Sequence, residues 1–270
     1  MSEFINKDSA ALDNIIEVRN VSQSYDNGQS WIIKDFNLVI EDKPNQGQFV
    51  MLLGMSGCGK STILRYIAGL QKPTQGEILI HGKPLDHTNR ISMVFQQYSS
   101  LPWKTVLENV ALALEFEGVN RKEREERAME MIKIVGLDGH EKKYAMYPTL
   151  SGGQLQRVAI ARSILANPEI LLMDEPFGAL DVKTRVSMQE LLADLWNRFH
   201  STIIFVTHDI SEAVYLGDDI YIMKYAPSKI VSHIPVDLPL HRKREMKREA
   251  SYTQIVHNVE DLMINVSGLK

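Results

Sequence analysis

Apolar residues in this chain fall into two kinds of pattern: short continuous runs and longer segments with helical spacing. Residues 169–174 and 202–207 are continuous apolar runs, as expected of parallel strands that are covered on both faces. The segment 182–199 between them repeats its apolar positions with helical spacing. This order predicts a strand–helix–strand unit with a right-handed crossover, and therefore an α/β core with a mainly parallel sheet.

The first part of the chain has the pattern of an antiparallel β unit. Residues 15–21 form a strand pattern, and residues 31–41 alternate as a returning strand would. Asn27 and Gly28 between them are a common hairpin signal. The apolar run 49–53 that follows predicts a buried strand. We therefore expect an N-terminal antiparallel β subdomain ahead of the parallel core, with residues 1–14 loosely ordered.

The middle of the chain has helical spacing and predicts an inserted helical subdomain at about residues 97–166. The helices are expected over residues 105–115, 121–135 and 154–166. Short strands are expected on both sides of this subdomain, at residues 76–80, 91–95, 220–223 and 229–234, and we interpret the last two as edge strands. One domain over residues 15–235 and a charged, helical tail over 236–270 complete the organisation.

Composition narrows the class of protein. The 270 residues are 44% hydrophobic and carry a formal net charge of −4, which disfavours a nucleic-acid surface. Cys58 is the only cysteine, so no disulfide framework is possible. The N-terminus lacks a signal-peptide pattern, and no apolar segment approaches the roughly 20 residues that span a bilayer. We expect a soluble, cytoplasmic chain that needs another chain if it works at a membrane.

The strongest chemical signal is a glycine-rich segment between the strand 49–53 and a helix that starts near residue 60. Its residues are Gly54, Met55, Ser56, Gly57, Cys58, Gly59, Lys60 and Ser61, followed by Thr62 in the helix. Strand, glycine loop and helix are the context of a phosphate-binding loop, in which backbone N–H groups and the helix dipole face an anion. Lys60 would bind the outer phosphates of a nucleoside triphosphate, and Ser61 would be a ligand of Mg²⁺.

Three more candidates follow the two apolar strands. Asp174 can hold Mg²⁺, and Glu175 can polarise an attacking water, because ligands gather where parallel strands end. His208 ends the next strand and could donate to a γ-phosphate, although a lone histidine is also found as an ordinary surface or core residue. Cys58 could be a reactive thiol beside a helix start, or simply a small residue that fits a tight loop.

A second anion-binding helix start is expected at Leu150-Ser151-Gly152-Gly153-Gln154. Ser151 is a good N-cap, and the glycines leave N–H groups free. Ser-Gly-Gly also occurs in ordinary loops, so the pattern alone is a weak signal. Two anion sites but one phosphate loop suggest a nucleotide shared between two copies of the chain.

Together these motifs make residues 15–225 resemble the ATP-binding cassette subunit of an ABC transporter, which has a P-loop NTPase core. The matching segments are the phosphate loop 54–61, Gln96 within 94–96, the signature segment 150–154, the strand 170–175, the loop 178–181, and His208 within 207–209. Tyr25 stands where the family places an aromatic residue that stacks on adenine. A soluble ATPase of the same type acting on ribosomes or DNA is the alternative.

The resemblance implies a head-to-tail dimer in which ATP lies between the phosphate loop of one copy and Ser151–Gln154 of the other. It implies that Gln96 contacts Mg²⁺ and the water and senses the membrane subunit. Glu175 would act as general base, His208 would contact the γ-phosphate, and Asp181 would couple the two sites. Permease subunits would be the membrane partners, with a solute-binding protein in the same system and no nucleic acid. The chain would lie peripherally at the cytoplasmic face of the cell membrane.

More narrowly, residues 98–110 and 229–239 resemble importer cassettes for nitrate, sulfonate and taurine. The run Tyr147-Pro148-Thr149-Leu150 before the signature is one residue shorter than usual, which could shift the surface that faces the membrane subunit. The basic run His241-Arg242-Lys243-Arg244 is interpreted as a solvated tail, with a membrane-surface contact as the alternative.

Overall fold

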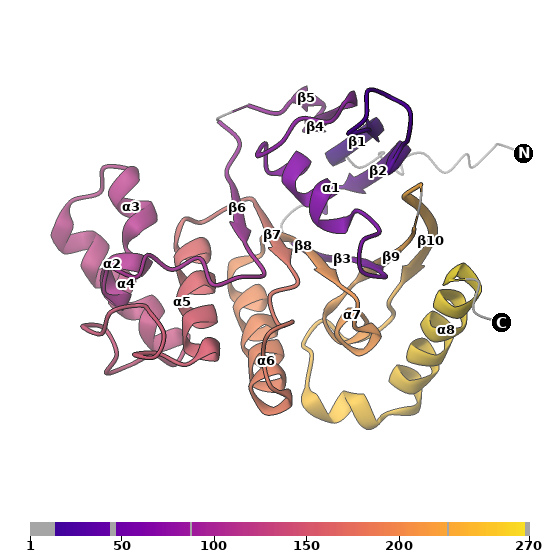
Figure 1. The fold of residues 1–270 in the computed structure, drawn as a ribbon. Helices are drawn as coiled ribbons and strands as arrows, with labels where there is room; N and C mark the ends of the chain where they lie inside the picture. The colour runs from indigo at the N-terminus through magenta and orange to yellow at the C-terminus, as the bar shows by residue number, and fades with distance from the viewer. Residues whose placement is uncertain (1–13, 44–46, 87, 226, 268–270) are drawn as a thin grey trace, which may run out of the picture.

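A computed structural model describes residues 14–43, 47–86, 88–225 and 227–267, so the expectation of a loose segment over residues 1–14 lies almost wholly outside the described residues. Within these ranges the chain builds two sheets and a group of helices (Figure 1). The six-stranded sheet has the order β10-β9-β3-β8-β7-β6, and the four-stranded sheet has the order β2-β1-β4-β5.

The larger sheet is parallel except for its last strand. Its members are β3 (Gln48–Gly54), β6 (Ile91–Val94), β7 (Ile170–Asp174), β8 (Thr202–Thr207), β9 (Asp219–Lys224) and β10 (Lys229–Pro235). The expectation that residues 220–223 form an edge strand was wrong, because β9 pairs with both β3 and β10. Its apolar residues Ile220, Ile222 and Met223 are fully buried, which is the burial pattern of an interior strand.

Both faces of the parallel sheet are covered, as the apolar runs predict. Along β3, Phe49, Met51 and Leu53 belong to the core beneath α5 (Gly152–Leu165), α6 (Val182–Phe199) and α7 (Ile210–Leu216). Val50 and Leu52 point to the second core, shared with α1 (Lys60–Ile67) and the antiparallel sheet. The helix 182–199 lies between two strands that pair in parallel, which confirms the predicted strand–helix–strand unit.

The antiparallel sheet confirms the predicted N-terminal β unit. It contains β1 (Asn14–Gln23), β2 (Ile33–Glu41), β4 (Gln75–Ile80) and the short β5 (Lys83–Pro84). In β2, Phe36, Leu38 and Ile40 are buried while the residues between them are exposed, as alternation predicts. Asn27 and Gly28 both have positive φ angles in the connection between β1 and β2. This sheet therefore covers the phosphate-loop helix α1 from one side.

The helical subdomain extends to the side opposite α8 (Ala250–Ser267) in Figure 1. The single helix expected over 105–115 is instead two short helices, α2 (Val106–Val110) and α3 (Leu112–Phe116). The Asn109 amide donates to the carbonyl oxygens of Leu101, Lys104 and Thr105, which ties this turn to the preceding loop. The helix α4 (Arg121–Ile134) is confirmed, and α5 begins at Gly152, two residues earlier than expected, because Ser151 and Gln154 form a capping box.

The C-terminal segment packs against the core, so the solvated basic run was a wrong interpretation for Arg242. This residue precedes a 3₁₀ turn, η1 (Arg244–Arg248), and only 7% of it is exposed. Its guanidinium donates to the carbonyl oxygens of Tyr215, Gly217, Leu238 and Pro239, and pairs with Asp218 at 3.0 Å. Burial lowers the pKa of Arg242, and the five partners keep its charge satisfied.

We predict that Arg242→Met destabilises the chain by about 3 kcal/mol, because it leaves the partly buried Asp218 carboxylate unpaired and removes the donors of four carbonyl groups. Urea unfolding monitored by circular dichroism measures the change. The control is Lys243→Met, an exposed neighbour, which should change the free energy of unfolding by less than about 0.5 kcal/mol. Equal stability of the two variants would show that Arg242 does not anchor the tail.

Candidate functional site

The predicted chemical residues meet at one edge of the parallel sheet. Strand register places Leu53 beside Thr207, and Val206 beside Asp174. The loops that follow β3, β7 and β8 therefore leave the sheet side by side, each carrying polar side chains. Neighbouring β6 ends at Val94, opposite Met173, which brings Gln96 to the same edge.

The ammonium of Lys60 lies inside the glycine loop. Only 4% of the residue is exposed, and its Nζ donates to the carbonyl oxygens of Gly54 and Met55 at 2.8 and 3.0 Å. It also lies 3.7 Å from Glu175 Oε1. A buried positive charge within a loop of N–H groups at the start of α1 is an arrangement suited to a polyphosphate.

Two further features hold this loop in place. Gly59 has φ of 90°, and a Cβ at this position would lie 2.8 Å from Ser228 Oγ. Only glycine combines that backbone angle with such a close approach. Cys58 is fully buried, and burial raises the pKa of its thiol. These observations support the interpretation of Cys58 as a small packing residue and argue against a reactive thiol.

Asp174 and Ser61 form the candidate metal site. Ser61 Oγ donates to Asp174 Oδ1 at 2.7 Å across the join between α1 and β7. Burial, together with the charge of Glu175, raises the pKa of Asp174, although the Ser61 hydrogen bond opposes the rise. A hydroxyl and one carboxylate are hard oxygen ligands that fit Mg²⁺ bound mainly through substrate phosphates. The described residues contain no cluster of three or more His, Cys, Asp or Glu that could hold a metal by themselves.

Glu175 and His208 contact each other directly. His208 Nδ1 lies 3.1 Å from Glu175 Oε2, and the imidazole is exposed while the carboxylate is half-buried. Glu175 has a positive φ of 43°, and its N–H donates to the carbonyl oxygen of Val206. This backbone conformation turns the carboxylate toward both Lys60 and His208. At these adjacent positions the Glu175 carboxylate can accept a proton and the His208 imidazole can donate a hydrogen bond.

Gln96 is exposed and borders the same group. A Cβ on Gly178 would lie 3.8 Å from Gln96 Nε2 and 3.8 Å from Glu175 Oε2, so the two side chains flank this glycine. The segment after Gln96 is held by Arg162, which donates to the carbonyl oxygen and to Oγ of Ser99. Gln96 thus connects the sheet edge with the helical subdomain.

The signature segment forms a helix start apart from the phosphate loop. Ser151 caps α5, and its N–H donates to Gln154 Oε1 at 2.9 Å. No hydrogen bond or ion pair among the described residues joins Ser151–Gln154 to the glycine loop. A Cβ on Gly153 would lie 2.5 Å from Thr184 Cγ2, so the segment packs closely on the start of α6. One copy of the chain therefore brings together the phosphate loop, Asp174, Glu175, His208 and Gln96, but not the signature.

Asp181 and Tyr25 are placed at the periphery. Asp181 caps α6 by accepting from the N–H groups of Lys183 and Thr184, and the Thr184 hydroxyl bond is the main cause of its lowered pKa. Tyr25 is 67% exposed in the turn after β1. Neither residue contacts the Lys60 group directly within the described part of the chain.

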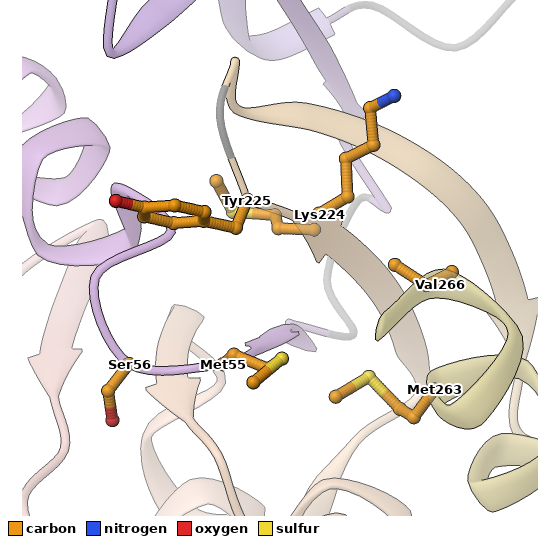
Figure 2. A pocket seen from close by; sticks show the side chains of 7 residues that line it. Met55, Ser56, Lys224, Tyr225, Met263 and Val266 are labelled. Carbon is orange, nitrogen blue, oxygen red and sulfur yellow. The ribbon is translucent and has the colours of Figure 1, made fainter. Parts of the chain in front are cut away.

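A pocket of about 400 Å³ lies beside the glycine loop (Figure 2). Its lining comes from the glycine loop, from the end of β9 and from α8: Met55, Ser56, Met223, Lys224, Tyr225, Met263 and Val266. Figure 2 shows Met55 and Met263 on opposite sides and the amino end of Lys224 directed away from them. The pocket is mostly apolar and lacks Lys60, so we do not assign it to a phosphate.

The sequence interpretation missed the residues that hold the His208 loop. Thr207 donates to Glu212 Oε2 at 2.8 Å, and Asp209 caps α7. The spacing of Asp209 and Glu212 is that of a capping box, a signal that would have placed a helix start directly after His208. It would not have shown that Glu212 bonds to Thr207, because that contact depends on how β8 meets α7.

Residues 39–178 match the family model described as ABC transporter. The chain belongs to the ABC transporter family. The chain is an ATPase subunit of the kind coupled to transmembrane transport. Among the residues that the structure describes, no helix has the length and apolarity to cross a membrane.

Named relatives cover most of this ABC ATPase. It is 43% identical to the taurine import ATP-binding protein TauB of Rhizobium johnstonii over 82% of this chain and 88% of that protein. It is 40% identical to the nitrate import ATP-binding protein NrtD of Synechocystis, over 86% and 87% respectively. The ATP-binding cassette MJ0796, solved as a dimer in a post-hydrolysis state with ADP and Pi bound, aligns with a TM-score of 0.68 and 36% identity, over 83% of this chain and 100% of that one.

We predict that Asp174→Asn leaves the ATP-free protein as stable as the wild type, or raises its melting temperature by up to about 3 °C at pH 7. The pKa of Asp174 is higher in the folded than in the unfolded chain, so its stabilising contribution is present at low pH and is lost as pH rises through the folded value. At pH 7 the ionised carboxylate therefore costs stability. Differential scanning calorimetry measures the shift.

The matched control is Asp138→Asn, the same change at an exposed carboxylate with an unaltered melting temperature expected. Adding ATP with Mg²⁺ should raise the melting temperature of the wild type more than that of Asp174→Asn, because the cation needs the carboxylate. If Asp174→Asn melts several degrees below the wild type without ligand, burial of the ionised Asp174 carboxylate does not destabilise the fold and the prediction is wrong.

Proposed function

We propose that this ABC ATPase drives an importer for a small anion such as nitrate, a sulfonate or taurine, at the cytoplasmic face of the cell membrane. The two named relatives are import proteins for taurine and for nitrate, which supports this substrate class. The observation that carries the proposal is that three side chains meet at one sheet edge: Glu175 lies 3.7 Å from Lys60 and 3.1 Å from His208. A nucleotide-binding module without turnover would not need the carboxylate.

In this proposal the loop of Gly54, Met55, Ser56, Gly57, Cys58, Gly59, Lys60, Ser61 and Thr62 holds the phosphates. Lys60 neutralises the outer phosphates, and its burial strengthens that interaction because little water screens it. Ser61, Asp174 and Gln96 would hold Mg²⁺, which would offset charge on the phosphates. Tyr25, exposed after β1, would stack on the adenine.

For hydrolysis, Glu175 accepts the proton of the attacking water, and His208 donates a hydrogen bond to the γ-phosphate. The 3.1 Å contact between their side chains supports these paired roles, since each group restrains the other at the reacting position. Lys60 lies 3.7 Å from Glu175, so the same ammonium faces both the base and the phosphate. No step uses the Cys58 thiol.

A second copy of the chain completes the site. Ser151–Gln154 is a helix start whose capping box uses the N–H groups of Ser151 and Gln154 and leaves out those of Gly152 and Gly153. The segment has no hydrogen bond to the glycine loop of its own chain, so these two glycines can serve the nucleotide of a partner. Asp181 and Gly153 both pack near Thr184, which joins the signature to the loop after Glu175. Closure of the dimer on ATP would therefore move residues at both nucleotide sites together.

The permease would dock on an exposed aromatic patch made by Tyr98, Trp103, Tyr144 and Tyr147. Their exposed fractions are 36, 68, 55 and 75%, and the backbone bridge between Thr105 and Tyr144 brings the segments of Trp103 and Tyr144 together. Tyr98 reaches the signature, because a Cβ on Gly152 would lie 2.2 Å from the Tyr98 hydroxyl, and it follows Gln96 by two residues. Movement at the nucleotide can thus reach the membrane subunit.

The test of the importer function is reconstitution with the permease and solute-binding protein encoded by neighbouring genes. Uptake of labelled taurine or nitrate that requires ATP is the expected result. Failure to co-purify with any permease, together with sedimentation on ribosomes, would favour the alternative of a soluble ATPase acting on ribosomes or DNA.

We predict that Glu175→Gln lowers kcat for ATP hydrolysis at least about 100-fold while ATP still binds, because the base is lost and the loop is intact. Phosphate release and retention of radiolabelled ATP measure the two effects. Glu126→Gln, an exposed glutamate on α4, is the matched control with normal turnover. Undiminished hydrolysis in Glu175→Gln would remove this residue from the role of base.

We predict that Trp103→Ala and Tyr147→Ala each weaken co-purification with the permease at least tenfold, which corresponds to about 1.4 kcal/mol. ATPase activity of the isolated chain should stay within twofold of the wild type. Val39→Ala, at an apolar residue of the antiparallel sheet that is 45% exposed, should leave co-purification unchanged. A permease yield that is normal in both aromatic variants would place the docking surface elsewhere.

A further inference from the structure

The loop that carries His208 is held by the hydroxyl of the residue before it. Thr207 is 2% exposed, and its Oγ1 donates to Glu212 Oε2 at 2.8 Å. The same oxygen accepts the backbone N–H of Asp209 at 3.0 Å. His208 therefore lies between two residues that one hydroxyl group joins, and the path of its backbone depends on that group.

Glu212 is the centre of a buried polar cluster. Only 4% of the residue is exposed, and burial is the main cause of its raised pKa. Its Oε1 accepts from Gln189 Nε2 at 3.3 Å and lies 3.7 Å from Arg185 Nε. Arg185 also pairs with Asp209, which caps α7. Arg185 on α6 therefore pairs both with Glu212 and with the residue that follows His208.

The C-terminal segment reaches this cluster through Lys247. Its Nζ donates to Gln189 Oε1 at 2.7 Å and lies 4.1 Å from the centre of the Tyr215 ring. Burial lowers the pKa of Lys247, while the charges of Asp209 and Glu212 oppose that change. A chain of direct hydrogen bonds therefore runs from Lys247 through Gln189 and Glu212 to Thr207.

The direction of these bonds gives Lys247 a specific effect. A glutamine amide has a donor end and an acceptor end, and an ammonium can only donate. By occupying Gln189 Oε1, Lys247 leaves the amide nitrogen to face Glu212. Without the ammonium the amide could turn its oxygen toward the carboxylate, which would repel it and displace the acceptor of the Thr207 hydroxyl.

We propose that Glu212 is a positioning residue for His208, and that Lys247 in the C-terminal segment controls it through the orientation of the Gln189 amide. The segment after β10 thereby sets how the imidazole is presented to the γ-phosphate. This inference rests on the proposed role of His208 in ATP hydrolysis. It connects the C-terminal segment to the proposed ATP site through residues that belong to none of the nucleotide-binding motifs.

The experiment is a double-mutant cycle on the full chain with Mg²⁺ and ATP, using Glu212→Gln, Lys247→Met and the double variant. Each single variant should lower kcat three- to tenfold while KM for ATP stays within twofold, because the phosphate loop is untouched. The double variant should be no slower than the slower single variant, because both changes act on one contact. Lys243→Met is the matched control, an exposed lysine in the same segment with unchanged kcat.

Spectroscopy separates positioning from loss of fold. In the protein labelled with ¹⁵N at histidine, the His208 ring signal, assigned by its disappearance in His208→Ala, should shift in Lys247→Met and not in Lys243→Met. If Glu212→Gln fails to fold, Lys247→Met with Gln189→Met still tests the same connection. Wild-type kcat and an unshifted signal in Lys247→Met would overturn the inference.

The failure of the proposed function gives a different result. If His208→Ala hydrolyses ATP at the wild-type rate, His208 has no role in turnover and both proposals fall. If His208→Ala is inactive while the effects of Glu212→Gln and Lys247→Met multiply independently in the double variant, only the positioning inference is wrong.

Discussion

The grouping of polar side chains at the edge of the parallel sheet depends on burial of the Lys60 ammonium there. A buried cation is costly unless oxygen atoms surround it, and here two loop carbonyl groups and the Glu175 carboxylate do so. That requirement needs the loops after β3 and β7 to meet at the same edge of the sheet. The pairing of β8 between these strands then brings His208 against Glu175.

The same edge also explains why one chain holds only part of the proposed site. Each side chain that follows a parallel strand is at the edge because of strand register, whereas Ser151–Gln154 starts a helix of the inserted subdomain. This helix packs on the start of α6 through Gly153 and does not turn toward its own glycine loop. This geometry supports the proposal that two copies share a nucleotide.

Sequence patterns were most informative where the physical cause is local. The continuous apolar runs, the spacing in α4 and α6, and the strand–glycine–helix context of Lys60 each depend on neighbours within about one helical turn or one strand. The interpretations that failed depend on distant partners. The strand β9 is interior because β10 pairs with it. The helix breaks after Val110 where Asn109 bonds to the loop carbonyl of Leu101, and Arg242 is buried because it pairs with Asp218.

By itself, then, the sequence determined the α/β class, the phosphate loop and the identity of Asp174, Glu175, His208 and Gln96 as candidates, because each follows from a residue type at a strand end or helix start. Tertiary structure alone decided that Glu175 touches both Lys60 and His208, and that Lys247 reaches the His208 loop through Gln189 and Glu212. The physical reason is that these contacts join residues far apart in the chain, and only the folded sheet brings their charges within range.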